Sequence, residues 1–197
     1  MHISGTDYYS PQPTIKLRKP LAITGYPGLK FRTLTYELAA ITGVSLVAVA
    51  RWVEHQAGKS LHKILLYDGI EIARGMESKL VRKSLNLKPP QFVVFADQVL
   101  LEDDNLKLVG TAAHLIYFHA SRTKLFWSIM HHAREHNVLP CVSLPVPLQR
   151  PEQLDTFLAA RESAMLAANC RIALEHDPDQ SSLEELMYAV QKLCCKE

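Results

Sequence analysis

The stretch LAITGYPGLKFRT, residues 21–33, sets the class of fold to expect. Its first four residues are mostly apolar or β-branched and are typical of a short buried strand. The next four, GYPG at 25–28, are typical of a turn, because glycine and proline interrupt both helices and strands. From Phe31 to Thr42 apolar residues recur at helical spacing, and Gly43 follows as a helix-terminating glycine. A strand, a glycine-containing turn and a helix in this order predict the first unit of an α/β fold.

The same alternation continues to the end of the chain. Apolar runs predict further strands at 45–49, 91–96, 114–118 and 170–174. Helical spacing predicts helices at 50–57, 61–67, 70–85, 123–136, 151–168 and 183–194. Ser60 is the expected N-cap of the helix 61–67, and Ser181 or Ser182 that of the last helix. We therefore expect a three-layer α/β/α domain at 20–197 with a mainly parallel five-stranded sheet, after a flexible lead-in at 1–19.

The composition fits one globular domain and excludes several classes of protein. The chain has 197 residues, 48% of them hydrophobic, and its net charge is +2. Such a balance of charge argues against a disordered tail and against a nucleic-acid partner. No run approaches the length of about 18 apolar residues that a membrane span needs, and residues 1–20 lack the apolar core of a signal peptide. The four cysteines form no disulfide or metal pattern, so we expect a cytoplasmic protein without a membrane partner.

A turn between a strand and a helix is where α/β proteins bind phosphate, because free amide N–H groups converge there. The working pattern is G-x-x-x-x-G-K-[ST], in which the lysine contacts phosphate and the hydroxyl contacts Mg²⁺. Here Gly25 fills the first position, but Lys30, Phe31 and Arg32 replace the second glycine, the lysine and the hydroxyl residue. Thr33 follows one position late. The predicted degenerate phosphate loop consists of Gly25, Gly28, Lys30, Arg32 and Thr33.

Two later segments resemble the shikimate kinase family, which has a P-loop kinase fold. They are WVEHQAGKSL at 52–61 and GIEIARGME at 69–77, against the family's I-E-x-x-x-G-x-S-I and G-E-x-x-F-R-x-x-E. The resemblance extends from Leu21 to the last predicted helix in the order and spacing of the strands. It implies that Arg74 and Arg161 bind the carboxylate of a small acid, because both match arginines with that role in the family.

Other motifs of the family are missing where the resemblance would place them. The metal-binding D-x-D falls on Ala48 and Ala50, the G-G-G falls near 96–98, and no arginine stands at the lid position near 139–140. The resemblance therefore implies a catalytically impaired protein, a pseudokinase, with no catalytic residue, no metal and no cofactor. Its expected role is to bind a small carboxylate ligand or to act as a regulatory module.

Two alternatives stay open. The first is a divergent ATP-dependent small-molecule kinase of shikimate type, in which Lys30 or Arg32 takes the role of the missing lysine and ATP and Mg²⁺ are cofactors. The second is a protein-interaction scaffold with a protein partner. The scaffold predicts that Tyr26, Leu29 and Phe31 fill the former phosphate site and that an apolar surface is exposed elsewhere.

Two of the candidate sites also have simpler interpretations. Arg74 and Arg161 can each form an ion pair with an acidic neighbour along the chain, as is common on helices. The segment HHAREH at 131–136 places His132 and His136 one helical turn apart, a spacing that can hold zinc. No third ligand is evident, so a hydrated polar face is favoured over a metal site.

Overall fold

The structure, a computed structural model, describes residues 15–137, 139–141 and 143–194. The strands are β1 (Leu21–Gly25), β2 (Leu46–Ala48), β3 (Phe92–Val94), β4 (His114–His119) and β5 (Cys170–Ala173). The α-helices are α1 (Phe31–Thr42), α2 (Val49–Ala57), α3 (Leu61–Tyr67), α4 (Ile70–Leu85), α5 (Asp103–Ala112), α6 (Arg122–His136), α7 (Asp155–Ala159), α8 (Glu162–Leu166) and α9 (Gln180–Cys194). Two 3₁₀ helices are η1 (Asp97–Leu101) and η2 (Pro151–Leu154).

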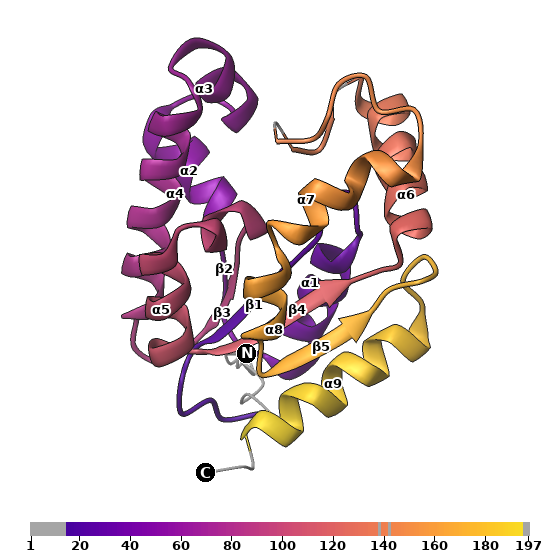
Figure 1. Cartoon of the computed structure of the whole chain (residues 1–197). Coiled ribbons are helices and arrows are strands. Elements are labelled where there is room, and N and C mark those ends of the chain that lie inside the picture. Colours follow the sequence, from indigo (N-terminus) through magenta and orange to yellow (C-terminus); the bar gives the residue numbers. More distant parts are fainter. Residues whose placement is uncertain (1–14, 138, 142, 195–197) are drawn as a thin grey trace, which may run out of the picture.

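The strands form one five-stranded sheet with the order β2-β3-β1-β4-β5, and every pairing in it is parallel. Helices α1 and α9 pack together on one face, whereas α4 and α5 cover the other (Figure 1). The central strands β1 and β3 are buried along their whole length, as expected for a parallel sheet covered on both faces. The predicted three-layer α/β/α fold is confirmed.

The opening unit follows its sequence signals closely. Helix α1 begins at Phe31 and ends at Thr42, and Gly43 adopts a left-handed φ of 68° as its C-terminal cap. A residue other than glycine would be strained at Gly43. Gly25 is needed for a different reason, because a Cβ placed there would lie 2.6 Å from the Cβ of Phe118 on β4. This close approach packs the end of β1 against its neighbour and positions the turn that follows.

Three parts of the chain differ from the sequence prediction. The single helix expected at 151–168 is wrong, because η2, α7 and α8 replace it and the chain breaks near Arg161, whose side chain is buried. The expected serine cap of the last helix is also wrong: Asp179 accepts a hydrogen bond of 2.9 Å from the amide of Ser182. Between β3 and β4 the chain forms η1 and α5, where no element was predicted.

Residues 1–14 of the predicted lead-in lie outside the described residues. Residues 15–19 form neither helix nor strand. Among the described residues, no helix is both long and apolar enough to cross a membrane.

Candidate ligand-binding cavity

A cavity of about 930 Å³ lies beyond the carboxyl ends of the adjacent strands β1 and β3. The turn after β1 and the start of α1 form its floor, α3 contributes an apolar wall, and α6 with residues 139–141 forms the opposite side. Helices α3 and α6 stand on opposite sides above the sheet in Figure 1. Ligands of open α/β sheets bind in this position, outside the carboxyl ends of the strands.

The backbone of the turn after β1 is bonded within the protein. The amide of Tyr26 donates to the carbonyl of Phe118 at 3.0 Å, and the amide of Leu29 donates to the carbonyl of Tyr26 at 3.3 Å. Pro27 has no N–H, and Gly28 takes a left-handed φ of 85° to close the turn. An anion cradle needs several amides that point at the ligand without a partner. Two of the amides at 26–29 are engaged elsewhere and a third does not exist.

Apolar side chains of the same turn are buried. Tyr26, Leu29 and Phe31 are each less than a tenth exposed, and the Phe31 ring stacks on Phe118 with centroids 5.5 Å apart. Leu29 and Phe31 nevertheless line the cavity. The position that would carry the phosphate-binding lysine is therefore an aromatic ring held by the core.

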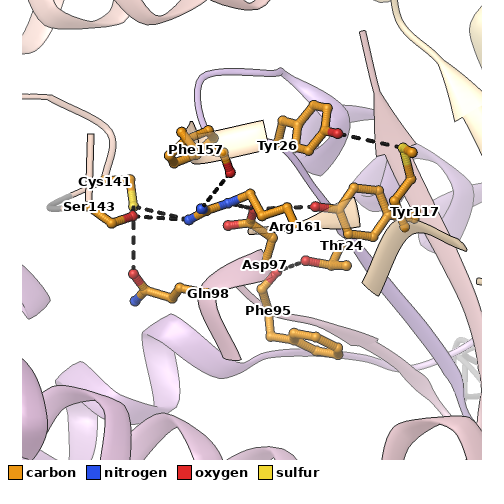
Figure 2. A network of polar contacts seen from close by, with 11 residues as sticks. Thr24, Tyr26, Phe95, Asp97, Gln98, Tyr117, Cys141, Ser143, Phe157 and Arg161 are labelled. Carbon is orange, nitrogen blue, oxygen red and sulfur yellow. Dashed lines mark hydrogen bonds and ion pairs between the residues drawn. The ribbon is translucent and has the colours of Figure 1, made fainter. Parts of the chain in front are cut away.

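Arg161 is the centre of a buried polar network on the sheet side of the cavity (Figure 2). Its Nε donates to Oδ2 of Asp97 at 2.5 Å, and Nη2 donates to Oγ of Ser143 at 3.0 Å. Nη1 donates to the carbonyl of Phe157 at 3.2 Å, and the guanidinium lies over the Phe157 ring, 3.5 Å from its centroid. Tyr117 adds a second donor to Asp97 at 3.3 Å. Every nitrogen of this guanidinium thus has a partner within the protein.

The electrostatics of the network are those of a desolvated ion pair. Burial raises the pKa of the Asp97 carboxyl, and the Arg161 charge and its hydrogen bond act in the opposite direction. Burial and the nearby Asp97 also raise the pKa of the Tyr117 hydroxyl, which keeps it protonated as a donor. Breaking one partner of such a pair leaves an uncompensated buried charge. The network therefore fixes the relative positions of η1, α7 and the segment at 143.

Arg74 lies elsewhere, on α4, and is not among the residues that line the cavity. Its Nη1 donates to Glu71 at 3.3 Å, one helical turn away, while its Nε is buried without a partner in the described chain. Glu77 on the same helix is fully buried and accepts a 2.7 Å hydrogen bond from Gln98. Burial raises the pKa of Glu77.

The two arginines of the predicted carboxylate clamp therefore have protein partners, Glu71 for Arg74 and Asp97 for Arg161. Neither lines the cavity. Their role in binding an acid stays a prediction. The sequence did not suggest Asp97 as a partner of Arg161, although a charged residue directly after the buried strand β3 was the signal available for it.

The cations that do line the cavity belong to the degenerate loop. Lys30 is held by Asp177, with 3.1 Å between Nζ and Oδ2, and Asp177 also bonds Lys124 at 3.3 Å. These two contacts lower the pKa of the Asp177 carboxyl. Arg32 is exposed in the cavity wall and forms no ion pair within the described residues. Thr33 lines the cavity beside it.

Helix α6 presents three histidines to the cavity, at 131, 132 and 136. His131 pairs with Glu135 at 3.2 Å, and the rings of His132 and His136 lie 4.4 Å apart. The predicted face is therefore present. In the part of the chain that the structure describes, no group of three or more His, Cys, Asp or Glu side chains is placed to hold a metal ion.

Several solved structures of small-molecule kinases share this fold. A gluconokinase from Sinorhizobium meliloti 1021 matches with a TM-score of 0.55 and 13% identity, over 89% of this chain and 93% of that one. Shikimate kinases match more closely. The enzyme from Bacteroides thetaiotaomicron has a TM-score of 0.67 and 16% identity, over 89% of this chain and 96% of its own.

The shikimate kinase from Acinetobacter baumannii, solved in complex with shikimate, has a TM-score of 0.69 and 16% identity, over 90% of this chain and 93% of that chain. In sequence, a shikimate kinase from Thermobifida fusca (strain YX) is 31% identical over 93 residues, which are 47% of this chain. The chain spans about half the length of this curated relative, 54%. No model of a known protein family matches the chain. The protein thus has a shikimate-kinase-like fold, and the predicted resemblance is confirmed at that level.

Proposed function

We propose that this protein binds a small carboxylic acid in the cavity and does not transfer phosphoryl groups. The observation that carries this proposal is the turn at 25–30, in which the amides of Tyr26 and Leu29 are bonded within the protein and which leads into Phe31. Phosphoryl transfer depends almost entirely on positioned positive charge and metal. The one cation of the turn, Lys30, is paired with Asp177, and the buried ring at 31 carries no charge.

ATP and Mg²⁺, which the fold implies, do not fit the residues at the turn. A phosphate group would need free amides in the turn, but the amides of Tyr26 and Leu29 already donate to carbonyl oxygens. A magnesium ion would need an oxygen ligand where Arg32 stands. These two mismatches support a pseudokinase rather than a kinase of the usual chemistry.

A small carboxylate suits the cavity for two reasons. Arg32 presents a guanidinium to the cavity, and guanidinium groups bind carboxylates through two parallel hydrogen bonds. The relative from A. baumannii is described in complex with shikimate, a small hydroxy acid. The resemblance predicts Arg74 and Arg161 as carboxylate ligands, but neither lines the cavity, and for Arg161 this role would require the incoming acid to displace or share Asp97. We therefore assign the carboxylate to Arg32.

Thermal unfolding tests the binding half of the proposal. Shikimate, quinate and other hydroxy acids should raise the melting temperature of the full chain in a concentration-dependent manner, because a ligand that binds only the folded state stabilises it. ATP with Mg²⁺ should leave the melting temperature unchanged. If none of the acids produces a shift, the cavity is not a carboxylate site.

Lys30 and Arg32 both line the cavity, and this observation favours the divergent kinase as the second candidate function. A coupled assay for ADP release, run with ATP, Mg²⁺ and each acid, separates the two. The pseudokinase predicts no release above the rate without protein. Turnover that disappears in Lys30→Ala would refute it.

A protein-interaction scaffold is supported by the burial of Tyr26, Leu29 and Phe31, which it predicted. However, a cavity of about 930 Å³ lies beside these side chains, and a filled, purely structural site would have no such cavity. We therefore rank acid binding above the scaffold.

A further inference from the structure

The histidine face of α6 is not used by the function proposed above. Of its three rings, His131 already has the Glu135 carboxylate as a partner. His132 and His136 face each other at 4.4 Å, and in the described chain neither ring is paired with a carboxylate. Two imidazoles at this distance cannot both be protonated without mutual repulsion.

Arg32 of α1 faces the same corner of the cavity. It is close enough to His132 for its charge to lower the pKa of that imidazole, and it forms no ion pair among the described residues. A fixed cation and a titratable base therefore line one cavity, and in the described chain the carboxylates that act on them, Glu77 on Arg32 and Glu135 on His132, form no ion pair with either.

Glu77 on α4 acts electrostatically on Arg32, but it is fully buried and accepts a hydrogen bond from Gln98. The other charged groups around this corner have partners within the protein. On α6, Glu135 is held by His131, and beyond the end of β3 Asp97 is held by Arg161. Lys30, the N-cap residue of α1, forms an ion pair with Asp177.

The wall opposite α6 is apolar. Helix α3 contributes Leu61, Leu65 and Leu66 to it, and on the α6 side Leu139, Pro140 and Cys141 also line the cavity. Apolar walls lower the local dielectric constant and strengthen any contact between an anion and a cation placed there.

We infer that carboxylate binding in this cavity is linked to proton uptake: the acid binds between Arg32 and His132, and the His132 imidazole takes up a proton as the acid binds. This inference rests on the proposed function and adds the residues and the pH response that belong to it. In the free protein, burial and then His136 lower the pKa of His132 most, Glu135 raises it, and Arg32 adds the smallest lowering effect. A bound carboxylate reverses that direction, because an opposite charge favours the protonated ring.

The sign of the pH response follows from linkage. In the free protein His132 loses its proton at a lower pH than it does in the complex. Between those two pKa values each bound acid brings up to one proton with it, so the Kd rises by as much as about tenfold per pH unit. Below both values and above both values the Kd is independent of pH. The acid itself contributes nothing to this change, because a carboxyl with a pKa of about 4 is ionised throughout.

Calorimetric titration of the full chain with shikimate and with quinate tests the inference. We expect Kd to be at least about tenfold lower at about pH 5.5 than at about pH 8, the range in which histidine titrates. Titrations in two buffers of different ionisation enthalpy should show proton uptake at intermediate pH. In a parallel NMR titration of the unaltered protein, the pKa of the His132 ring should rise when the acid is added to saturation.

Three variants identify the groups. His132→Gln should abolish the pH dependence of Kd, so that the tighter binding expected at about pH 5.5 is lost. Arg32→Gln should weaken binding at every pH by about tenfold or more, the loss of a charged hydrogen bond. The matched control is His55→Gln on the exposed face of α2, outside the cavity, which should change neither.

The outcomes separate this inference from the function on which it rests. If no acid binds at any pH, the proposed function fails and the inference fails with it. If an acid binds equally well at both pH values, or if His132→Gln keeps the full pH dependence, the inference is overturned and acid binding stands. An unchanged pKa of His132 on saturation would overturn it in the same way.

Discussion

On the sheet side of the cavity Arg161 is buried and bonded to Asp97, whereas on the α6 side Arg32 is exposed and has no ion-pair partner in the described chain. Both are arginines beside one cavity, and their surroundings give them different capacities. All three guanidinium nitrogens of Arg161 donate hydrogen bonds to acceptors within the protein. Arg32 forms no ion pair within the described residues, so its donors are available to a ligand.

This difference indicates that the sheet side shapes the cavity and the α6 side recognises what enters it. Removing either member of a buried ion pair greatly lowers stability, because the remaining partner is left charged and desolvated. An exposed cation costs little to keep or to remove. The two sides should therefore respond in opposite ways to substitution: large effects on stability on one side, large effects on binding on the other.

The largest expected effect is on the buried pair. Asp97→Ala leaves the Arg161 guanidinium buried without a counter-charge and should lower the free energy of unfolding by about 3 to 5 kcal/mol. Urea unfolding measures it. Arg32→Ala is the comparison on the other side and should change stability by no more than about 0.5 kcal/mol.

The double variant Asp97→Leu with Arg161→Met should recover most of that loss, because it removes both charges. Equal losses for Asp97→Ala and Arg32→Ala would show that the two sides do not differ as described.

Gly25→Ala should destabilise the protein by about 3 kcal/mol, because the added Cβ would meet the Cβ and carbonyl oxygen of Phe118 at 2.6 and 2.7 Å. Gly75→Ala on α4 is the matched control, since nothing lies within 4 Å of its new Cβ. That control should stabilise the helix by up to about 1 kcal/mol. Thermal unfolding of both variants checks the contrast, and a harmless Gly25→Ala would mean that β1 and β4 are less closely packed at this point.

Glu77→Gln should stabilise the protein at neutral pH by about 1 kcal/mol. Burial raises the pKa of Glu77 above its ordinary 4.5 in the folded state, so the carboxyl loses its proton first in the unfolded chain. The wild type therefore loses stability as the pH rises from about 4.5 through the folded pKa, and glutamine removes that loss. The gain should shrink towards zero on acidification, as measured by urea unfolding across pH. A gain that grows at low pH would contradict the assignment.

The smallest effect is expected at the rim of the cavity. Asp177→Asn removes the carboxylate that holds Lys30 and Lys124, and it should cost less than about 1 kcal/mol because all three side chains are partly exposed. The loss in melting temperature relative to wild type should become smaller in high salt, because salt screens exposed charges. A larger, salt-independent loss would place Asp177 with the buried side of the comparison.

Local signals in the sequence predicted most of the fold. The limits of α1, the glycine at 43 and the Ser60 cap were all predicted, because each depends on neighbouring residues only. The break near Arg161 could not be predicted in this way. It depends on Asp97, which is 64 positions away and reaches Arg161 only in the folded sheet. The acidic residues Asp103 and Asp104, in the first turn of α5, were a local signal that sequence reasoning missed.

The candidate site was predicted in part. Motif spacing identified the residues of the degenerate loop, and Lys30, Arg32 and Thr33 do line the cavity. The pairing of Arg161 with Asp97 and the placement of His132 near Arg32 required the structure. Both depend on contacts between distant elements, which one sequence cannot supply.

The most direct test is equilibrium titration of the full chain with ADP, with and without Mg²⁺, followed by calorimetry. We predict no saturable binding, because the turn at 26–29 offers too few free amides for a diphosphate and the ring of Phe31 replaces its cation. Saturable binding that inorganic pyrophosphate displaces, together with a crystal structure showing the diphosphate against these amides, would contradict the proposal.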